Sequence, residues 1–147
     1  MATLIRFISA TRRERSVGVR AFAWVVLYRI GLWIMPFRVA KKWTVNGAAE
    51  NSIAYDDGVV TEIVRGVRFA SKFVPYASCL TQALAARRLL RASGHVAQLK
   101  IGVAKSTGDF EAHAWLEIDG HIVLGKQRMH SRYAVLSSSA AIPRSVR

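Results

Sequence analysis

The chain has a single cysteine, Cys79, and the residues around it are suited to nucleophilic chemistry. Ser78 is a good helix N-cap, because its hydroxyl can accept a hydrogen bond from an orphan backbone N–H. Cys79 is then expected to be the first residue of a helix, where unsatisfied N–H groups and the helix dipole favour a thiolate. The same N–H groups can stabilise an oxyanion. The alternative interpretation is that Cys79 is a packed, unreactive helix residue.

His113 is the residue that can act as a base toward this thiol. It lies in a segment of alternating apolar and polar residues, which predicts a strand, and the small Ala112 and Ala114 leave room around its imidazole. A helix that carries the nucleophile, followed by a strand that carries the base, suits a cysteine hydrolase. Trp115 is predicted to share the strand face of His113, where it walls the site, donates to an oxyanion or packs in the core.

No metal or cofactor site is predicted. The other histidines lack the spacing of zinc ligands, either among themselves or relative to the cysteine; they are His95, His121 and His130. The chain also has no glycine-rich phosphate loop and no dinucleotide-binding fingerprint. We therefore expect the protein to work without a cofactor.

Two helices are predicted in the middle of the chain. Apolar residues recur at helical spacing over residues 59–73, and Pro75 stops that helix. The second helix begins at Cys79 and ends at Gly94, a typical C-terminal residue. One stripe of this helix is rich in small residues, so the helix can lie close against a sheet. The stripe comprises Cys79, Ala83, Ala86 and Leu90.

The hydrophobic period changes from that of a helix to that of a strand after Gly94. Alternation predicts three antiparallel strands over residues 98–103, 110–118 and 121–124. The last two are joined by a hairpin turn at Asp119-Gly120. We therefore predict an α+β fold in which helices pack around a small antiparallel sheet.

The charge of the chain is strongly one-sided. There are 22 Lys and Arg against nine Asp and Glu, a net charge of +13, and no carboxylate follows Asp119. Such a surface favours an anionic partner, but no nucleic-acid motif with interleaved aromatics is present, so nucleic-acid binding is not expected. Asp56 and Asp57 are interpreted as a solvated turn. The single cysteine favours a reducing, cytoplasmic location.

Residues 21–37 form the most apolar stretch of the chain. It has 17 residues, contains Arg29 and is ended by Pro36. A bilayer needs roughly 20 residues, and a charge near the middle of a span costs about 2.5–3.5 kcal/mol. A helix that is buried or faces a partner is therefore preferred. A helix lying in a membrane surface is the alternative.

Three parts of the chain resemble the transglutaminase-like leader peptidases of lasso-peptide biosynthesis: Ser78-Cys79-Leu80, residues 94–103, and Phe110-Glu-Ala-His-Ala-Trp-Leu-Glu-Ile-Asp-Gly120. The resemblance covers about residues 70–125, and the apolar helix ending in Met35-Pro36-Phe37 is similar to the family's N-terminal portion. It implies a papain-like α+β fold and a bacterial cysteine protease that removes the leader from a ribosomally made precursor. Cys79 is then the nucleophile and His113 the general base.

The third member of the family's catalytic triad is the point at which this chain departs from the pattern. An acid is expected about 12 positions after the histidine, but Gly125 stands there. Asp119 is the nearest downstream carboxylate and is kept as a candidate, although it lies about 20 Å along the strand from His113 at about 3.3 Å per residue. The other candidates to orient the imidazole are Glu111, Glu117 and Gln127.

The resemblance also implies partners and a division of the chain. The partners are the precursor peptide, a small separate leader-recognition protein and the lasso cyclase. Residues 1–45 are expected to form a basic helical segment that packs on the core or on a partner, residues 46–136 the transglutaminase-like protease domain, and residues 137–147 a loose tail. The alternative function is a non-catalytic subunit that binds a peptide or a membrane surface.

Overall fold

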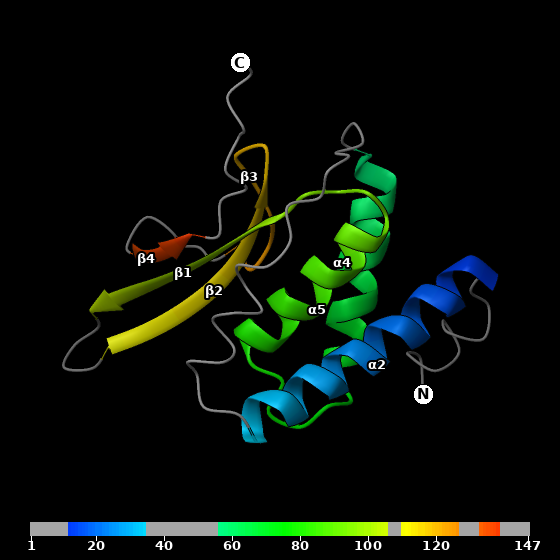
Figure 1. Cartoon of the computed structure of the whole chain (residues 1–147), viewed down its shortest axis with the longest axis horizontal. Helices are drawn as coiled ribbons and strands as arrows, with labels where there is room; N and C mark the ends of the chain where they lie inside the picture. Colours follow the sequence, from blue (N-terminus) through cyan, green and yellow to red (C-terminus); the bar gives the residue numbers. More distant parts are fainter. Residues whose placement is uncertain (1–11, 35–55, 106–109, 127–132, 139–147) are drawn as a thin grey trace, which may run out of the picture.

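The structure, a computed structural model, describes residues 12–34, 56–105, 110–126 and 133–138. These hold helices α2 (Arg12–Ile34), α4 (Asp57–Ser71) and α5 (Cys79–Ala92), and strands β1 (Gln98–Lys105), β2 (Phe110–Ile118), β3 (His121–Leu124) and β4 (Ala134–Ser138). The strands form one antiparallel sheet in the order β3-β2-β1-β4. The three helices gather on one side of the sheet (Figure 1). The predicted α+β class is therefore confirmed.

Helix α4 is capped by Asp56, which was expected to lie in a solvated turn. Asp56 is the N-cap, and its Oδ1 accepts hydrogen bonds from the N–H groups of Gly58 (2.9 Å) and Val59 (3.2 Å). The interpretation of Asp56 as a mere turn residue is therefore wrong. Asp57 is exposed in the first turn of the helix, where its negative charge interacts favourably with the positive end of the helix dipole.

Helix α5 begins and ends where the sequence predicts. Ser78 is its N-cap, and the serine hydroxyl accepts the N–H of Thr81 at 3.3 Å. Gly94 follows the C-cap with a φ of 85°, a left-handed conformation that glycine adopts at little cost. The inward stripe is tightly packed, because Ala83, Ala86 and Leu90 are all 0% exposed. Helix α5 thus approaches the sheet closely, which fixes the position of its first residue.

His95 has a structural role between the two helices. Its side chain is buried, and its Nε2 accepts the backbone N–H of Asp56 at 3.2 Å, so the ring proton lies on Nδ1, which is 3.3 Å from the Ser93 hydroxyl. The imidazole thereby links the start of α4 to the end of α5. No catalytic role is needed to explain this histidine.

The two faces of the sheet are packed by different residues. On β2, Ala114, Leu116 and Ile118 belong to the main core, together with the helices. The next residues in the alternation turn to the opposite face, where Trp115 packs with Tyr133 and with Ala104 of β1. Burial on both faces explains why β2 is buried almost continuously from His113 to Ile118.

Strand β4 was not predicted. It pairs with the edge of β1 and ends at Ser138, inside the segment that was expected to be a loose tail from residue 137 onward. The register of this pairing shifts between Ile101 and Gly102, so a bulge interrupts it. Residues 139–147 lie outside the described part of the chain.

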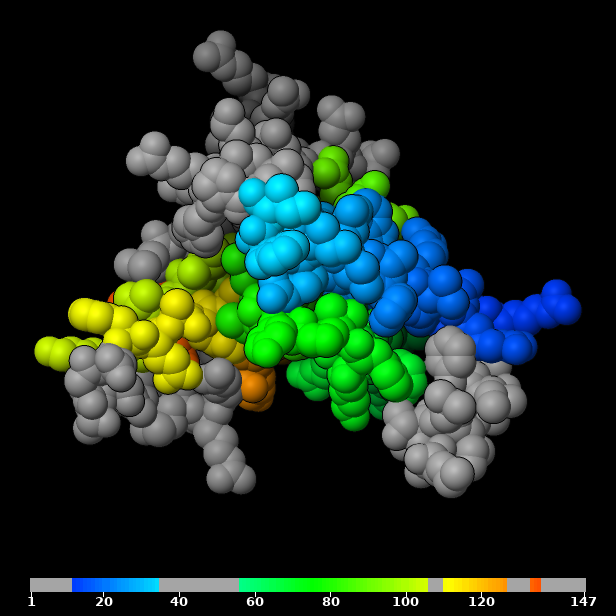
Figure 2. Space-filling view, turned by 90° about the horizontal axis from the view of Figure 1, so that it is seen from below, coloured from blue at the N-terminus to red at the C-terminus, as the bar shows by residue number. Residues whose placement is uncertain are grey.

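Helix α2 begins at Arg12, well before the predicted apolar stretch, and residues 35–37 of that stretch lie outside the described part of the chain. Only Ala21 and Val25 are buried, against α4 and α5. Figure 2 shows the helix lying across the surface of the molecule. By length and composition α2 passes a test for membrane-spanning helices that core helices of soluble proteins and signal sequences also pass. The helix is therefore only partly buried, and the other form of the same expectation, a helix that faces a partner, stays a prediction.

Tyr28, a partly buried residue of α2, should make stability depend on alkaline pH. Burial raises the pKa of its phenol above 10.0, an effect that Arg88 and Arg87 partly oppose. The folded state therefore favours the neutral phenol, and this stabilisation is present below about pH 10 and lost as the pH rises through the folded pKa. Tyr28→Phe should reduce the loss of stability between about pH 9 and about pH 11, measured as the urea midpoint. Identical profiles for the two proteins would contradict this expectation.

Candidate active site

Cys79 lies at the N-terminus of α5 with free backbone donors beside it. Its side chain is half-buried and packs against the edge of the main core. The N–H of Thr81 is taken by the Ser78 hydroxyl and that of Gln82 by the Ser78 carbonyl. The first turn of a helix leaves four N–H groups without helical partners, so those of Cys79 and Leu80 remain available in the described part of the chain. The thiol therefore sits where an oxyanion can be stabilised.

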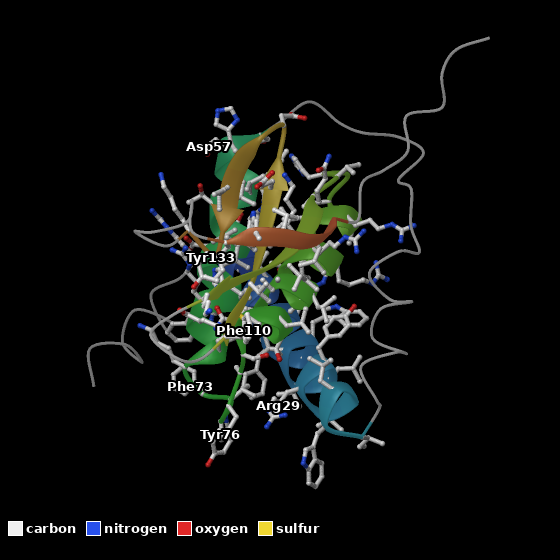
Figure 3. All side chains as sticks on the ribbon, turned by 90° about the vertical axis from the view of Figure 1, so that its left-hand side faces the viewer. Arg29, Asp57, Phe73, Tyr76, Phe110 and Tyr133 are labelled. Carbon is white, nitrogen blue, oxygen red and sulfur yellow. The ribbon has the colours of Figure 1, made fainter. Side chains whose placement is uncertain are left out.

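His113 is held on β2 by a hydrogen bond and by aromatic rings. Its side chain is only 7% exposed. The Nε2 atom lies 2.7 Å from the carbonyl oxygen of Gly125. The imidazole stacks on Trp115, with ring centroids 6.1 Å apart and planes 17° apart, and lies 5.4 Å from the ring of Tyr133. Figure 3 shows Tyr133 over the sheet, at a distance from the exposed Tyr76 and Phe73.

The bond to Gly125 decides which ring nitrogen is basic. A carbonyl oxygen can only accept, so Nε2 must carry the proton of this hydrogen bond. In the neutral ring, the lone pair then lies on Nδ1. His113 therefore has the tautomer in which Nδ1 is the atom that can take a proton from a nucleophile.

Trp115 shares the strand face of His113, as the strand pattern predicts. Its indole N–H donates to Glu117 Oε1 at 2.7 Å, and the other oxygen of Glu117 forms an ion pair with Lys100. The indole N–H is thus engaged with a carboxylate and is not directed at the thiol. The stacking against His113 suits a residue that walls the site and fixes the imidazole plane.

The structure does not join Cys79 and His113 by a hydrogen bond. Helix α5 packs on β2, so the two residues lie on elements that touch, and Figure 1 shows α5 beginning beside the strand. The thiol, however, contacts the helix-facing core, whereas His113 stacks with Trp115 on the other side of the strand. The thiol makes no hydrogen bond within the described part of the chain. A catalytic contact between them therefore requires a movement of the start of α5 relative to β2.

The candidate acids are not brought to the imidazole. Asp119 is exposed in the turn between β2 and β3, with a φ of 48°, at the far end of the strand from His113. Glu111 is exposed and makes no hydrogen bond to His113. Glu117 is committed to Trp115 and Lys100. Gln127 lies outside the described residues.

Two residues at the site were not foreseen in these roles. Gly125 was recognised only as the place of a missing acid, although its carbonyl is the group that meets the imidazole. Tyr133 follows the predicted strands in a segment with no clear periodicity, so no sequence signal pointed to it. Among the residues that the structure describes, no three His, Cys, Asp or Glu side chains gather as a metal site.

Comparison with known families gives one clear result. A family model described as the transglutaminase-like superfamily matches residues 19–138, which include every described strand and most of α2. Neither the curated proteins nor the solved structures that were compared gave a significant match.

Proposed function

Because the chain belongs to the transglutaminase-like superfamily, we propose that it is a cysteine peptidase with Cys79 as nucleophile and His113 as general base. The observation that carries the proposal is the thiol at the start of α5, beside the available N–H groups of Cys79 and Leu80. The tautomer of His113 supports it, because Nε2 carries the ring proton in its hydrogen bond to the Gly125 carbonyl, which makes Nδ1 the basic nitrogen of the neutral ring. These are the groups that thioester chemistry needs.

The proposed reaction has two steps. The imidazole Nδ1 of His113 takes the thiol proton as Cys79 Sγ attacks the scissile carbonyl carbon, and the oxyanion is stabilised by the N–H groups at the start of α5. The C–N bond breaks, and the proton on Nδ1 goes to the leaving amine, so that a thioester remains on Cys79. Water then attacks the thioester and gives a proton to Nδ1. The C–S bond breaks, the acid product leaves, and the proton on Nδ1 returns to Cys79 Sγ, which restores the thiol.

We further propose that the substrate is the precursor of a lasso peptide, and that the reaction removes its leader in the cytoplasm. The motif around His113 and its spacing from Cys79 support this substrate class. The proposed partners are a small leader-recognition protein and the cyclase that closes the ring. The leader-recognition protein would present the scissile bond of the precursor at the thiol.

Detection of the acyl-enzyme tests the proposal. The purified chain, mixed with a precursor peptide and its leader-recognition protein, should release the leader, and rapid acid quenching should leave a leader fragment on Cys79, detected by mass spectrometry. Prior alkylation of the thiol should block both events. Leader release that survives alkylation would exclude Cys79 as the nucleophile.

A non-catalytic binding subunit is the second candidate function. The observation that favours it is the separation of Cys79 from His113, together with the aromatic packing of the imidazole on Trp115. A subunit of this kind would bind the leader and its recognition protein but leave the precursor intact. The same experiment separates the two functions, because binding without leader release supports only the subunit.

The outer face of α2 is the proposed docking surface for the leader-recognition protein. From Val19 onward it carries exposed apolar side chains, which are Val19, Phe22, Leu27, Ile30, Trp33 and Ile34. Near the end of α2, Arg29 donates to the Pro75 carbonyl at 3.3 Å and lies 5.8 Å over the ring of Tyr76, which extends the surface (Figure 3). Large exposed apolar patches of this kind mark interaction sites.

Replacing Trp33 on this surface should weaken docking. Trp33 is 80% exposed, so Trp33→Ala removes little from the folded core, whereas a buried interface tryptophan typically contributes about 2 kcal/mol or more, or about thirtyfold in affinity. The affinity for the leader-recognition protein can be measured by calorimetry. Val135→Ala, 51% exposed on β4, is the control and should change nothing. Equal affinities for both variants would remove α2 from the interface, and binding of the wild type to anionic vesicles would favour a membrane surface instead.

A further inference from the structure

We infer that the backbone carbonyl of Gly125 is the group that orients the catalytic imidazole, in the place where the family pattern has an acidic side chain. Gly125 stands 12 positions after His113, and its oxygen lies 2.7 Å from Nε2. The catalytic consequence rests on the proposed peptidase function. The hydrogen bond and the tautomer that it imposes do not, so they can be tested separately.

Only glycine fits at this position. Gly125 has a φ of +86°, which side chains rarely adopt, and an added Cβ would lie 2.8 Å from Trp115 Cβ and 2.9 Å from the Ala114 carbonyl oxygen. The backbone of Gly125, directly after the end of β3, therefore lies in close contact with β2. This close approach brings the Gly125 carbonyl within hydrogen-bond distance of the ring, and any side chain here, an acidic one included, would push it away.

The carbonyl performs one of the two tasks of a triad acid. It fixes the ring orientation and the tautomer, because it can accept a hydrogen bond from Nε2–H but cannot donate one. An amide side chain in the acid's place can donate and impose the wrong tautomer, which in a serine protease costs about 10⁴ in kcat. A carbonyl avoids this loss. It supplies no negative charge, however, so it stabilises the imidazolium less than a carboxylate does.

The surroundings of the ring support a positioning role. Trp115 stacks on the imidazole on β2, and Tyr133 approaches it from the segment before β4. Gly102 lies opposite His113 in the β1–β2 register, and a Cβ there would meet the ring of Trp115 at 3.0 Å. The imidazole is therefore enclosed by two aromatic rings and one carbonyl, and rotation of the ring is restricted.

The tautomer can be measured directly in the resting protein. In a long-range ¹H–¹⁵N spectrum of the histidine-labelled full chain, His113→Gln assigns the His113 signals among the four histidines. At a pH where the ring is neutral, we expect the proton on Nε2. A proton on Nδ1 in the wild type would overturn the inference, whether or not the protein cleaves any peptide.

A pair of glycine variants tests the role in catalysis. Gly125→Ala should displace the carbonyl, mix the two tautomers of His113 and lower kcat for leader release by about a hundredfold with little change in KM, because displacements of about 1 Å cost rates of this size. Gly120→Ala is the matched control, since Gly120 has a φ of +79° but nothing within 4 Å of an added Cβ. It should keep the wild-type tautomer and kcat. Equal effects of both variants on kcat and tautomer would contradict the inference.

Asp119→Asn separates the carbonyl from the remaining carboxylate candidate. The exposed turn holds Asp119 away from the ring, so this variant should keep both the Nε2–H tautomer and a kcat within about twofold of the wild type. A loss of a hundredfold would assign the orienting role to Asp119. If Gly125→Ala does not fold, the wild-type tautomer decides the matter. If the wild type is inactive, the peptidase proposal fails while the tautomer result stands.

Discussion

Replacing Cys79 with alanine is expected to abolish leader release while leaving the fold intact. The thiol is half-buried at the first position of α5 and makes no hydrogen bond in the described part of the chain. Its removal therefore costs little packing, and alanine is favourable in a helix. Loss of a catalytic nucleophile lowers kcat by about 10⁶ in a comparable hydrolase. Leader release by the variant, followed by mass spectrometry, should fall to the uncatalysed background.

Two further variants show whether Cys79 works as part of a unit with His113. Cys79→Ser keeps the shape of the side chain but replaces the thiolate with a weak nucleophile, so it should be nearly as inactive as alanine. Cys79→Ala combined with His113→Gln should be no worse than Cys79→Ala alone, because groups that act together in one step are not additive. Wild-type rates in Cys79→Ala, with its partner still bound, would leave only the binding-subunit function.

Local signals predicted those parts of the fold that local chemistry determines. The N-cap at Ser78, the glycine after α5 and the Asp119-Gly120 turn each depend on a few neighbouring residues. The small-residue stripe of α5 also predicted its close contact with the sheet. Asp56 was misjudged because two adjacent acids suit both an exposed turn and a helix cap, and only the hydrogen bonds to Gly58 and Val59 distinguish them.

Elements that depend on tertiary contacts were missed or misplaced. Strand β4 is short, lies at the sheet edge and pairs with β1 across a bulge at Ile101 and Gly102. Its sequence therefore lacks the regular alternation of apolar and polar residues that predicts a strand. Helix α2 was predicted from Ala21 because the hydrophobic signal starts there. In the structure the helix begins earlier, at Arg12. The exposed charged residues there are compatible with a helix but do not by themselves predict one.

The candidate site was predictable in its residues but not in its geometry. Cys79 was predicted from the signals for a helix start and His113 from the strand motif, because both signals depend on neighbouring residues in the sequence. The partner of the imidazole was not predictable. A search for an orienting group among side chains cannot find a carbonyl, and the close approach of Gly125 to Trp115 exists only once β3 has returned along β2.

Leu116→Ala should cause the largest loss of stability among simple core substitutions on β2. Leu116 is 0% exposed, faces the helices and lies between Leu99 of β1 and Leu124 of β3 in the sheet register. Truncation of such a residue costs about 2–5 kcal/mol, because the cavity only partly collapses. A domain of this size has a total stability of about 5–15 kcal/mol. The free energy of unfolding, measured in urea, should fall by this amount.

Leu27→Ala is the matched control, because it makes the same chemical change on a leucine of α2 that is 54% exposed. It should alter stability by less than about 0.5 kcal/mol. The contrast also separates the two roles assigned to leucines in this chain, since Leu27 belongs to the docking surface. Leu116→Ala should lose stability but keep its affinity for the leader-recognition protein at temperatures where it is folded, whereas Leu27→Ala should do the opposite. Equal stability losses would mean that the outer face of α2 is covered within the folded chain and is not available for docking.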